Sequence, residues 1–144
     1  MKTWTQRLFP LLLAAGLLAG AVPVRAAESG FTDVSGSDYF AQAVAWAVEN
    51  GITQGTGGGA FSPENTVTRA EAVTFLWRSA GEPAPASSAS PFTDVTDPNA
   101  YYYDAVLWAA EQGITGGTTP TTFSPASTCT RGQIVTFLFR ALAE

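Results

Sequence analysis

Several kinds of reactive side chain are scarce in this chain. The sequence has no histidine, and it has a single cysteine, Cys129. Without histidine, and with no cluster of cysteines or carboxylates at ligand spacing, we expect neither a metal site nor a cofactor. One cysteine cannot form a disulfide within the chain, so the domain must be held together by packing. We interpret Cys129 as a small apolar filler beside a helix start rather than as an intermolecular bridge.

Positive charge is also scarce, and much of it lies at the N-terminus. Residues 1–26 contain a basic stretch, an apolar run shorter than the ~20 residues of a membrane-spanning helix, and small residues before Ala27. We interpret them as a signal peptide cleaved after Ala26, which predicts a secreted protein without a membrane span. Of the seven basic residues, three lie in this segment, which leaves four arginines against 12 acidic residues. The basic face that nucleic acid requires is therefore missing.

The remainder of the chain contains one pattern twice. The first copy has Phe-Thr-Asp-Val, a tryptophan, Gly-Ile-Thr, Phe-Ser-Pro and Thr-Arg-Ala-Glu, beginning at Phe31, Trp46, Gly51, Phe61 and Thr68. The second copy has them in the same order, with the last one reading Thr-Arg-Gly-Gln, at Phe92, Trp108, Gly113, Phe123 and Thr130. The offset is about 61 residues at first and about 62 from the first helix onward, so a single inserted residue aligns the copies.

Each copy is predicted to form two helices separated by a loop. Apolar residues at helical spacing predict a first helix over 38–50 and its counterpart over about 102–112, each stopped by a glycine. The following Gly-, Thr- and Pro-rich residues indicate an ordered turn system or a short strand pair. A second helix then begins near Thr68 or Thr130. The predicted fold class is therefore mainly α, with tandem helix–loop–helix repeats.

These predictions divide the chain into four segments. They are a signal peptide (1–26), repeat 1 (27–81), an extended and solvated Pro/Ser/Ala linker (82–91) and repeat 2 (92–144). A unit of about 55 residues is small for an independent core, so we expect the copies to pack on each other or on neighbours.

The Thr-Arg motif combines a helix cap with an unexplained arginine. Thr followed by Glu or Gln three residues later is a capping box, which accounts for two pairs, Thr68 with Glu71 and Thr130 with Gln133. It does not account for Arg69 and Arg131, because a cation at the positive end of a helix dipole costs about 0.3–1 kcal/mol. An ion pair with a recurring aspartate, Asp33 or Asp94, would explain these arginines, and so would a bound carboxylate or other oxyanion.

Other recurring residues also have two interpretations. Trp46 and Trp108 could stack on sugar rings, but matching positions in two helices favour packing. Asp33 and Asp94 could act as paired acids in glycoside hydrolysis, yet their place before the first helix favours capping or turn formation. We therefore predict no enzyme. Tyrosines 101–103 are expected to be partly exposed, and two further arginines suit the negative ends of their helices as structural residues, Arg78 and Arg140.

In this order, the motifs make the chain resemble a pair of S-layer homology domains, over residues 31–81 and 92–142. The resemblance implies a non-covalent cell-surface anchor that binds secondary cell-wall polysaccharide, often pyruvylated, on bacterial envelopes. It also implies that the motif arginines contribute to a carbohydrate groove. The candidate carbohydrate-binding residues are Thr68, Arg69, Glu71, Thr130, Arg131, Gln133, Asp33, Asp94, Trp46, Trp108, Gly55 and Gly117.

Two departures from the family pattern affect this expectation. The family commonly has three repeats around a pseudo-threefold axis, with grooves between neighbours, whereas this chain has two. Either a partner chain completes the set or two repeats suffice, so the alternative function is an assembly module that pairs with other S-layer homology chains or with itself. In the second motif, Gln133 lacks the charge of Glu71, and Gly132 loosens the first helical turn. If only one groove functions, we expect it to involve Arg69.

Overall fold

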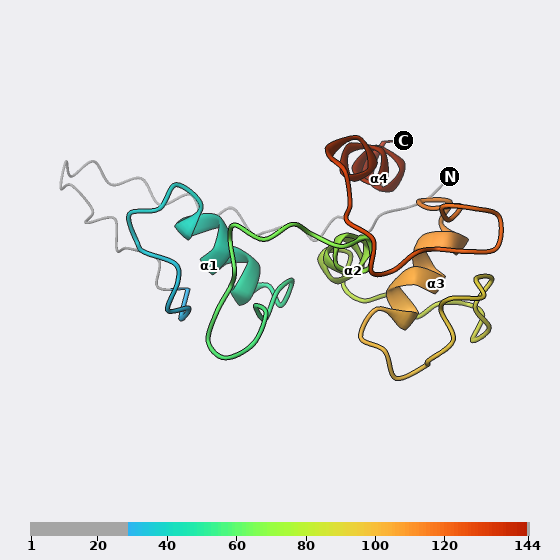
Figure 1. Ribbon diagram of the computed structural model, residues 1–144, viewed down its shortest axis with the longest axis horizontal. Coiled ribbons are helices and arrows are strands. Elements are labelled where there is room, and N and C mark those ends of the chain that lie inside the picture. Colours follow the sequence, from blue (N-terminus) through green and yellow to red (C-terminus); the bar gives the residue numbers. More distant parts are fainter. Residues whose placement is uncertain (1–28, 144) are drawn as a thin grey trace, which may run out of the picture.

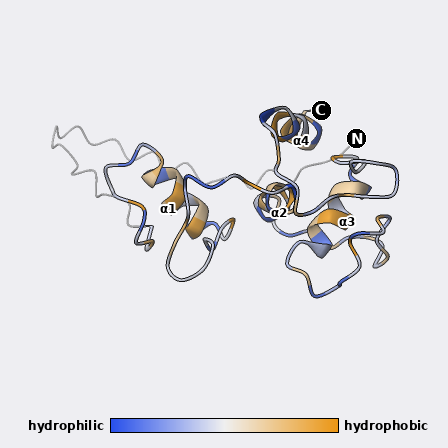
Figure 2. Cartoon of the chain, in the orientation of Figure 1, coloured by the Kyte–Doolittle hydropathy of each residue, from blue (hydrophilic) through white to orange (hydrophobic). Residues whose placement is uncertain are grey.

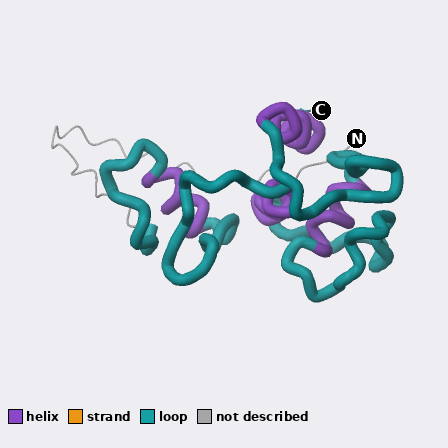
Figure 3. Tube along the Cα trace, in the orientation of Figure 1, coloured by secondary structure: helices purple, strands orange, loops and turns teal. Residues whose placement is uncertain are grey.

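The computed structural model describes residues 29–143, so the predicted signal peptide lies outside the described residues. Four helices run through this part of the chain, α1 (Ala41–Glu49), α2 (Arg69–Ser79), α3 (Tyr103–Glu111) and α4 (Arg131–Leu142). Loops join them, and residues 29–143 contain only isolated β-bridges and no strand (Figure 3). The mainly α fold class is thus confirmed. None of these helices is long and apolar enough to cross a membrane.

The helix boundaries follow the local signals in the sequence. Both predicted capping boxes form, because the Thr68 Oγ1 atom accepts from the Glu71 N–H (3.2 Å) and a Glu71 carboxylate oxygen accepts from the Thr68 N–H (2.7 Å). The equivalent distances at Thr130 and Gln133 are 3.2 and 3.0 Å. The first helix of each repeat ends just before a glycine at φ 70°, a left-handed conformation that glycine adopts readily.

Helix packing crosses the boundary between the repeats. Helix α2, from repeat 1, packs on α3 of repeat 2 and also contacts α4. Figure 1 shows these three helices together and α1 apart from them, and within residues 29–143 α1 contacts no other helix. The packed unit is therefore the second helix of one repeat with the first half of the next.

The main core lies at this crossing. Its largest fully buried apolar side chains come from α2, from α3 and from the repeat 2 loops, and they are Val73, Val95, Val106, Leu107, Ile114 and Phe123. Burial of each such side chain contributes about 1.5–3 kcal/mol. Cys129 is a free, buried thiol in the same cluster, as expected for a small apolar filler. Tyr103 is also buried there, although the sequence suggested partial exposure.

Backbone hydrogen bonds attach the start of α2 to the loop before α4. The N–H of Arg69 donates to the Ser127 carbonyl (2.9 Å) and that of Ala70 to the Pro125 carbonyl (3.0 Å). In the opposite direction, the Cys129 N–H donates to the Val67 carbonyl (2.8 Å). These bonds satisfy N–H groups that a helix N-terminus otherwise leaves free, so they fix where α2 begins on repeat 2.

The segment between the repeats is surface-exposed but attached to the helices. The Glu111 carboxylate accepts from the N–H groups of Ala86 (2.9 Å) and Ser87 (2.8 Å). The Trp77 indole donates to a carbonyl at one end of the segment, that of Pro83 (2.9 Å). Residues 82–91 are therefore more than a spacer, because they fasten α2 to α3.

Candidate functional site

A surface groove of about 540 Å³ lies between the repeat 1 loop and helix α2. One wall is the repeat 1 loop over residues 53–67, and the other is the exposed side of α2. Tyr101 is contributed by repeat 2, just before α3. The side chains that give this groove its chemistry are Gln54, Asn65, Glu71, Phe75, Arg78 and Tyr101. Repeat 2 thus contributes Tyr101 to a groove whose walls come from repeat 1.

Arg78 supplies the positive charge of the groove. Its Nη1 atom donates to the Ile52 carbonyl (3.2 Å), and its Nε atom lies 3.8 Å from the Glu82 carboxylate. These contacts hold the guanidinium against the repeat 1 loop and leave donors for another partner. An arginine held in this way is well suited to carboxylate binding, because its planar fork can donate two parallel hydrogen bonds.

Tyr101 supplies an exposed aromatic surface. Its ring is 55% exposed and makes an edge-on contact with Tyr102, with 5.1 Å between ring centroids. Partial burial is the main cause that raises the pKa of Tyr101, and the nearby Glu71 carboxylate adds to it. The phenol therefore stays neutral at ordinary pH, as an apolar ring with a polar tip. An aromatic ring beside convergent polar groups is a common composition for a ligand site.

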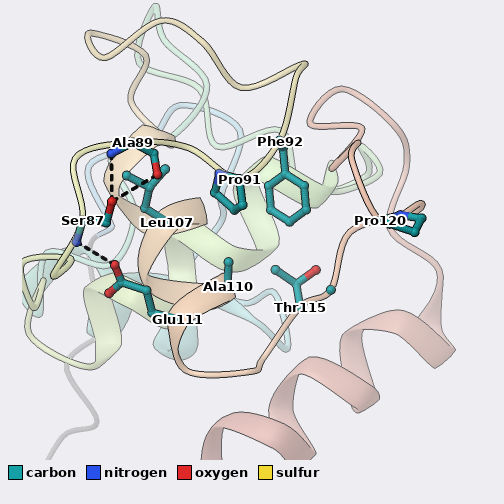
Figure 4. A pocket seen from close by; sticks show the side chains of 10 residues that line it. Ser87, Ala89, Pro91, Phe92, Leu107, Ala110, Glu111, Thr115 and Pro120 are labelled. Atoms are coloured by element: carbon teal, nitrogen blue, oxygen red, sulfur yellow. Dashed lines mark hydrogen bonds between the residues drawn. The ribbon is translucent and has the colours of Figure 1, made fainter.

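Another surface hollow, of about 490 Å³, lies between the 87–91 segment, α3 and the repeat 2 loop. Figure 4 shows that most of the labelled lining residues are apolar, among them Phe92, Leu107 and Ala110, with Glu111 at one side. The Glu111 carboxylate is already bound to the backbone of Ser87 (2.8 Å). Because its one carboxylate is used in this way, this hollow offers less for a ligand than the groove.

Arg69 is buried, not presented to solvent as an open guanidinium. It is 3% exposed, and its Nε atom donates to the Phe123 carbonyl (2.8 Å). The guanidinium carbon lies 4.8 Å from the Phe123 ring centroid and 5.4 Å from that of Phe137, both cation–π distances. Burial lowers the pKa of Arg69, and its Nη2 atom has no hydrogen-bond partner within residues 29–143. Arg69 thus joins α2 to repeat 2.

Arg131 occupies the same motif position but a different environment. It is exposed at the start of α4, and the described part of the chain gives its side chain no hydrogen-bonding or charged partner. Of the two motif arginines, only Arg131 is accessible to a dissolved or polymeric anion. The helix caps at Thr68 and Thr130 are equivalent, but the arginines that follow them have different surroundings.

The recurring aspartates bind backbone, not arginine. The Asp33 carboxylate accepts from the N–H groups of Phe61 (2.8 Å) and Ser62 (2.7 Å), and the pKa of Asp33 is lowered chiefly by these bonds. Asp94 makes the equivalent bonds to Phe123 (2.8 Å) and to its neighbouring serine (2.7 Å). Arg78 with Glu82 is the one ion pair within residues 29–143, so the suggested pairing of Arg69 with Asp33 or Asp94 is wrong. The aspartates instead fix the Phe-Ser-Pro turns.

The remaining candidate residues are the two tryptophans and the two loop glycines. Trp108 is 7% exposed and belongs to the core, whereas Trp46 on α1 is 56% exposed. Gly55 lines the groove and Gly117 is its equivalent, and both have positive φ angles. A Cβ atom at Gly117 would lie 2.5 Å from two carbonyl oxygens of its own turn, so this glycine is needed for the backbone to approach closely.

Two groove residues, Arg78 and Tyr101, are absent from the sequence-based candidates. The position of Arg78 in the last turn of a helix indicated a structural role, and its contact with the Ile52 carbonyl agrees with that role. No local pattern brings Tyr101 to α2, because they meet only through the packing of α2 on α3. The run of three tyrosines at the start of α3 was the one signal for a groove residue here, because the sequence indicated that these side chains are partly exposed.

The family comparison agrees with the repeat pattern and the fold. The model of the S-layer homology domain matches residues 30–73 and 91–135, which is more than half of the chain. The chain belongs to the S-layer homology domain family. Both matched ranges include the motif arginine and end within the second helix of their repeat.

Similar proteins include surface proteins of several bacteria. The chain is 36% identical over 94% of its length to the surface-layer 125 kDa protein of Lysinibacillus sphaericus, and this match covers 11% of that protein. It is 34% identical over 81% of its length to a cell surface protein of Thermoanaerobacter kivui, covering 16% of it. A cellulosome-anchoring protein of Acetivibrio thermocellus is 33% identical over 63% of the chain, with 21% of that protein covered.

The S-layer homology chain thus spans about a tenth to a fifth of these relatives. Family membership and the surface-layer relatives make it a secreted, cell-surface protein. Residues 29–143 contain no group of three side chains that could hold a metal ion.

Proposed function

We propose that this chain is a non-catalytic cell-surface anchor that binds secondary cell-wall polysaccharide carrying carboxylate groups, such as pyruvyl ketals. The observation that carries the proposal is the groove between the repeat 1 loop and α2, which Arg78 and Tyr101 both line. Membership in the S-layer homology family and similarity to a cellulosome-anchoring protein support the anchoring role.

The groove supplies the three kinds of contact that an acidic sugar requires. Tyr101 and Phe75 offer apolar ring surface for a pyranose face, and the exposed amides of Gln54 and Asn65 can bond to hydroxyls. Arg78 would take the carboxylate through its free donors. Because the whole chain is acidic, this recognition depends on local contacts and not on long-range attraction.

The motif arginines have separate roles in the proposal. In a single copy of the chain, Arg131 is exposed at the positive end of α4 and is a second cation that can contact the polymer. Arg69 acts indirectly, because its buried contacts with Phe123 hold α2 where it forms a groove wall. Glu71 lines the groove but already accepts from Thr68, so its role is to preserve the helix start.

Co-sedimentation with cell-wall sacculi tests the proposal. The protein is mixed with sacculi that retain the secondary polymer, with sacculi stripped of it, and with sacculi that lack only pyruvyl groups. We expect binding to the first alone. Arg78→Gln should weaken it by roughly 10–100-fold, the loss of a hydrogen bond to a charged group.

Two further variants separate the roles of the arginines. Arg131→Gln removes the same charge outside the groove and should weaken binding less than Arg78→Gln. Asp104→Asn, a charge change at an exposed residue on α3, is the control and should bind like the wild type. A folded wild type that ignores polymer-bearing sacculi would refute the anchor and favour the assembly role.

A further inference from the structure

Helix α4 leaves a long apolar face uncovered. Val135, Phe139 and Leu142 follow one another at helical spacing and are 63, 67 and 64% exposed, and Leu138 beside them is 40% exposed. Within residues 29–143, α2 is the only helix that α4 contacts. Four exposed large apolar residues on a single 12-residue helix form the kind of patch that marks a protein interface.

The repeat shows what normally covers this face. With the offset of about 62 residues, Val135, Leu138, Phe139 and Leu142 correspond to Val73, Leu76, Trp77 and Ala80 of α2. Val73 is fully buried in the cluster that joins α2 to α3, and the other three pack against that cluster. The uncovered face of α4 is therefore the same face that α2 uses to dock on the first helix of the next repeat.

Helix α1 has the matching uncovered face. It is the counterpart of α3, yet it contacts no other helix in the described part of the chain. Ala43 and Trp46 are exposed on α1, whereas their counterparts on α3, Ala105 and Trp108, are buried. Figure 2 shows apolar ribbon along α1, away from the other helices. One chain thus carries both halves of a second α2–α3 type of junction, and within residues 29–143 no other helix covers either half.

The motif arginine provides an independent match. Arg69 docks on the Phe-Ser-Pro turn of repeat 2, through the Phe123 carbonyl and ring. Its counterpart Arg131 is exposed, and the equivalent turn in repeat 1 presents Phe61, which is half-buried where Phe123 is fully buried. The next residues of that turn, 64–66, are exposed as well. Among them, Asn65 corresponds to Ser127, whose carbonyl accepts from the Arg69 N–H at the start of α2.

We propose that copies of this chain associate head to tail, with α4 of one copy packed on α1 of the next as α2 packs on α3. Arg131 of the first copy then lies on the Phe61 turn of the second copy, so within the assembly it contacts this turn and not the polymer. Both complementary surfaces belong to this chain, and in the structure α1 and α4 of one copy do not touch, so a second copy is the partner. Such a contact joins two different surfaces, and it therefore closes into a ring or continues as a chain.

Association would also complete a second groove. Tyr39, 97% exposed before α1, is the counterpart of groove residue Tyr101. In the head-to-tail arrangement, Tyr39 of the second copy lies beside Gln133 and Arg140 of the first, as Tyr101 lies beside Glu71 and Arg78. This consequence rests on the proposed polysaccharide function, whereas the association itself does not.

Light scattering coupled to size-exclusion chromatography tests the association without any polysaccharide. As the protein concentration increases, the wild-type mass should rise to two or more times that of one chain. A variant with a disrupted α4 face, Phe139→Asp with Leu142→Asp, should be monomeric. A variant with a disrupted α1 face, Ala43→Asp with Trp46→Asp, should also be monomeric. Ala84→Asp, the same kind of change at an exposed residue between the repeats, should associate like the wild type.

Mixing the two monomeric variants gives the decisive result. Each retains the surface that the other has lost, so one intact α4–α1 contact remains possible and the mixture should form a complex of two chains and no larger. Circular dichroism of each variant checks that the helices persist. A wild type that stays monomeric at every concentration refutes the proposal, and so does a mixture of folded variants that forms no two-chain complex.

Discussion

The first halves of the two repeats have nearly the same sequence pattern but very different surroundings. Trp108 is 7% exposed and Phe123 is fully buried, whereas their counterparts Trp46 and Phe61 are exposed and half-buried. The internal turns are the same, because Asp33 and Asp94 make equivalent bonds to their Phe-Ser-Pro segments. The difference is α2, which covers the second repeat and not the first. A repeat in this protein is therefore a unit of sequence, and the unit of packing is offset from it by half a repeat.

The largest expected contrast is between two phenylalanines. Phe123→Ala should lower the free energy of unfolding by about 3–5 kcal/mol, because it leaves a cavity in the closed core. Phe61→Ala, at the equivalent half-buried position, should cost about 1–2 kcal/mol, since less apolar surface is lost. Urea denaturation of both variants measures the two values. Equal losses would mean that repeat 1 has a core of its own.

The two motif arginines should differ next most strongly. Arg69→Ala deprives the buried Phe123 carbonyl of its donor and should destabilise the protein by about 1–3 kcal/mol. Arg131→Ala removes an exposed side chain and should change stability by no more than about 0.5 kcal/mol in the monomer. Thermal unfolding of both variants at low concentration compares them. A loss at Arg131 as large as that at Arg69 would contradict their different burial.

The smallest effect should come from acid titration of Asp33. Backbone hydrogen bonds lower its pKa below the ordinary value of 3.8. A carboxylate with a lowered pKa contributes stability above the unfolded-state pKa and loses it as the pH falls through the folded-state pKa. The difference in stability between the wild type and Asp33→Asn should therefore shrink as the pH drops below about 3.8. A difference that is constant through this range would show that the bonds to Phe61 and Ser62 do not depend on the charge.

Local signals predicted the elements of the fold well. The capping boxes at Thr68 and Thr130 and the glycine stops after α1 and α3 depend on neighbouring residues only, so the sequence shows them directly. The partner of each helix is not a local property. An apolar face on α2 indicates that something covers it, but the same pattern suits α1 or α3 equally.

The candidate site was predicted less completely for the same reason. The motif position of Arg69 predicts a cation at a helix start, but its burial results from Phe123, which lies 54 residues further along the chain. Likewise, Tyr101 reaches the groove only because α2 crosses to repeat 2. Residues whose surroundings come from the other repeat are the ones that sequence reasoning misplaced or omitted.

The most direct test of the offset packing unit is to compare two fragments. Residues 92–144 contain a complete sequence repeat, and residues 66–144 add α2 to it. We expect only the longer fragment to unfold cooperatively in urea, because α2 supplies Val73 and the Arg69 contacts to the core. Cooperative unfolding of residues 92–144 with the same stability as the longer fragment would contradict it.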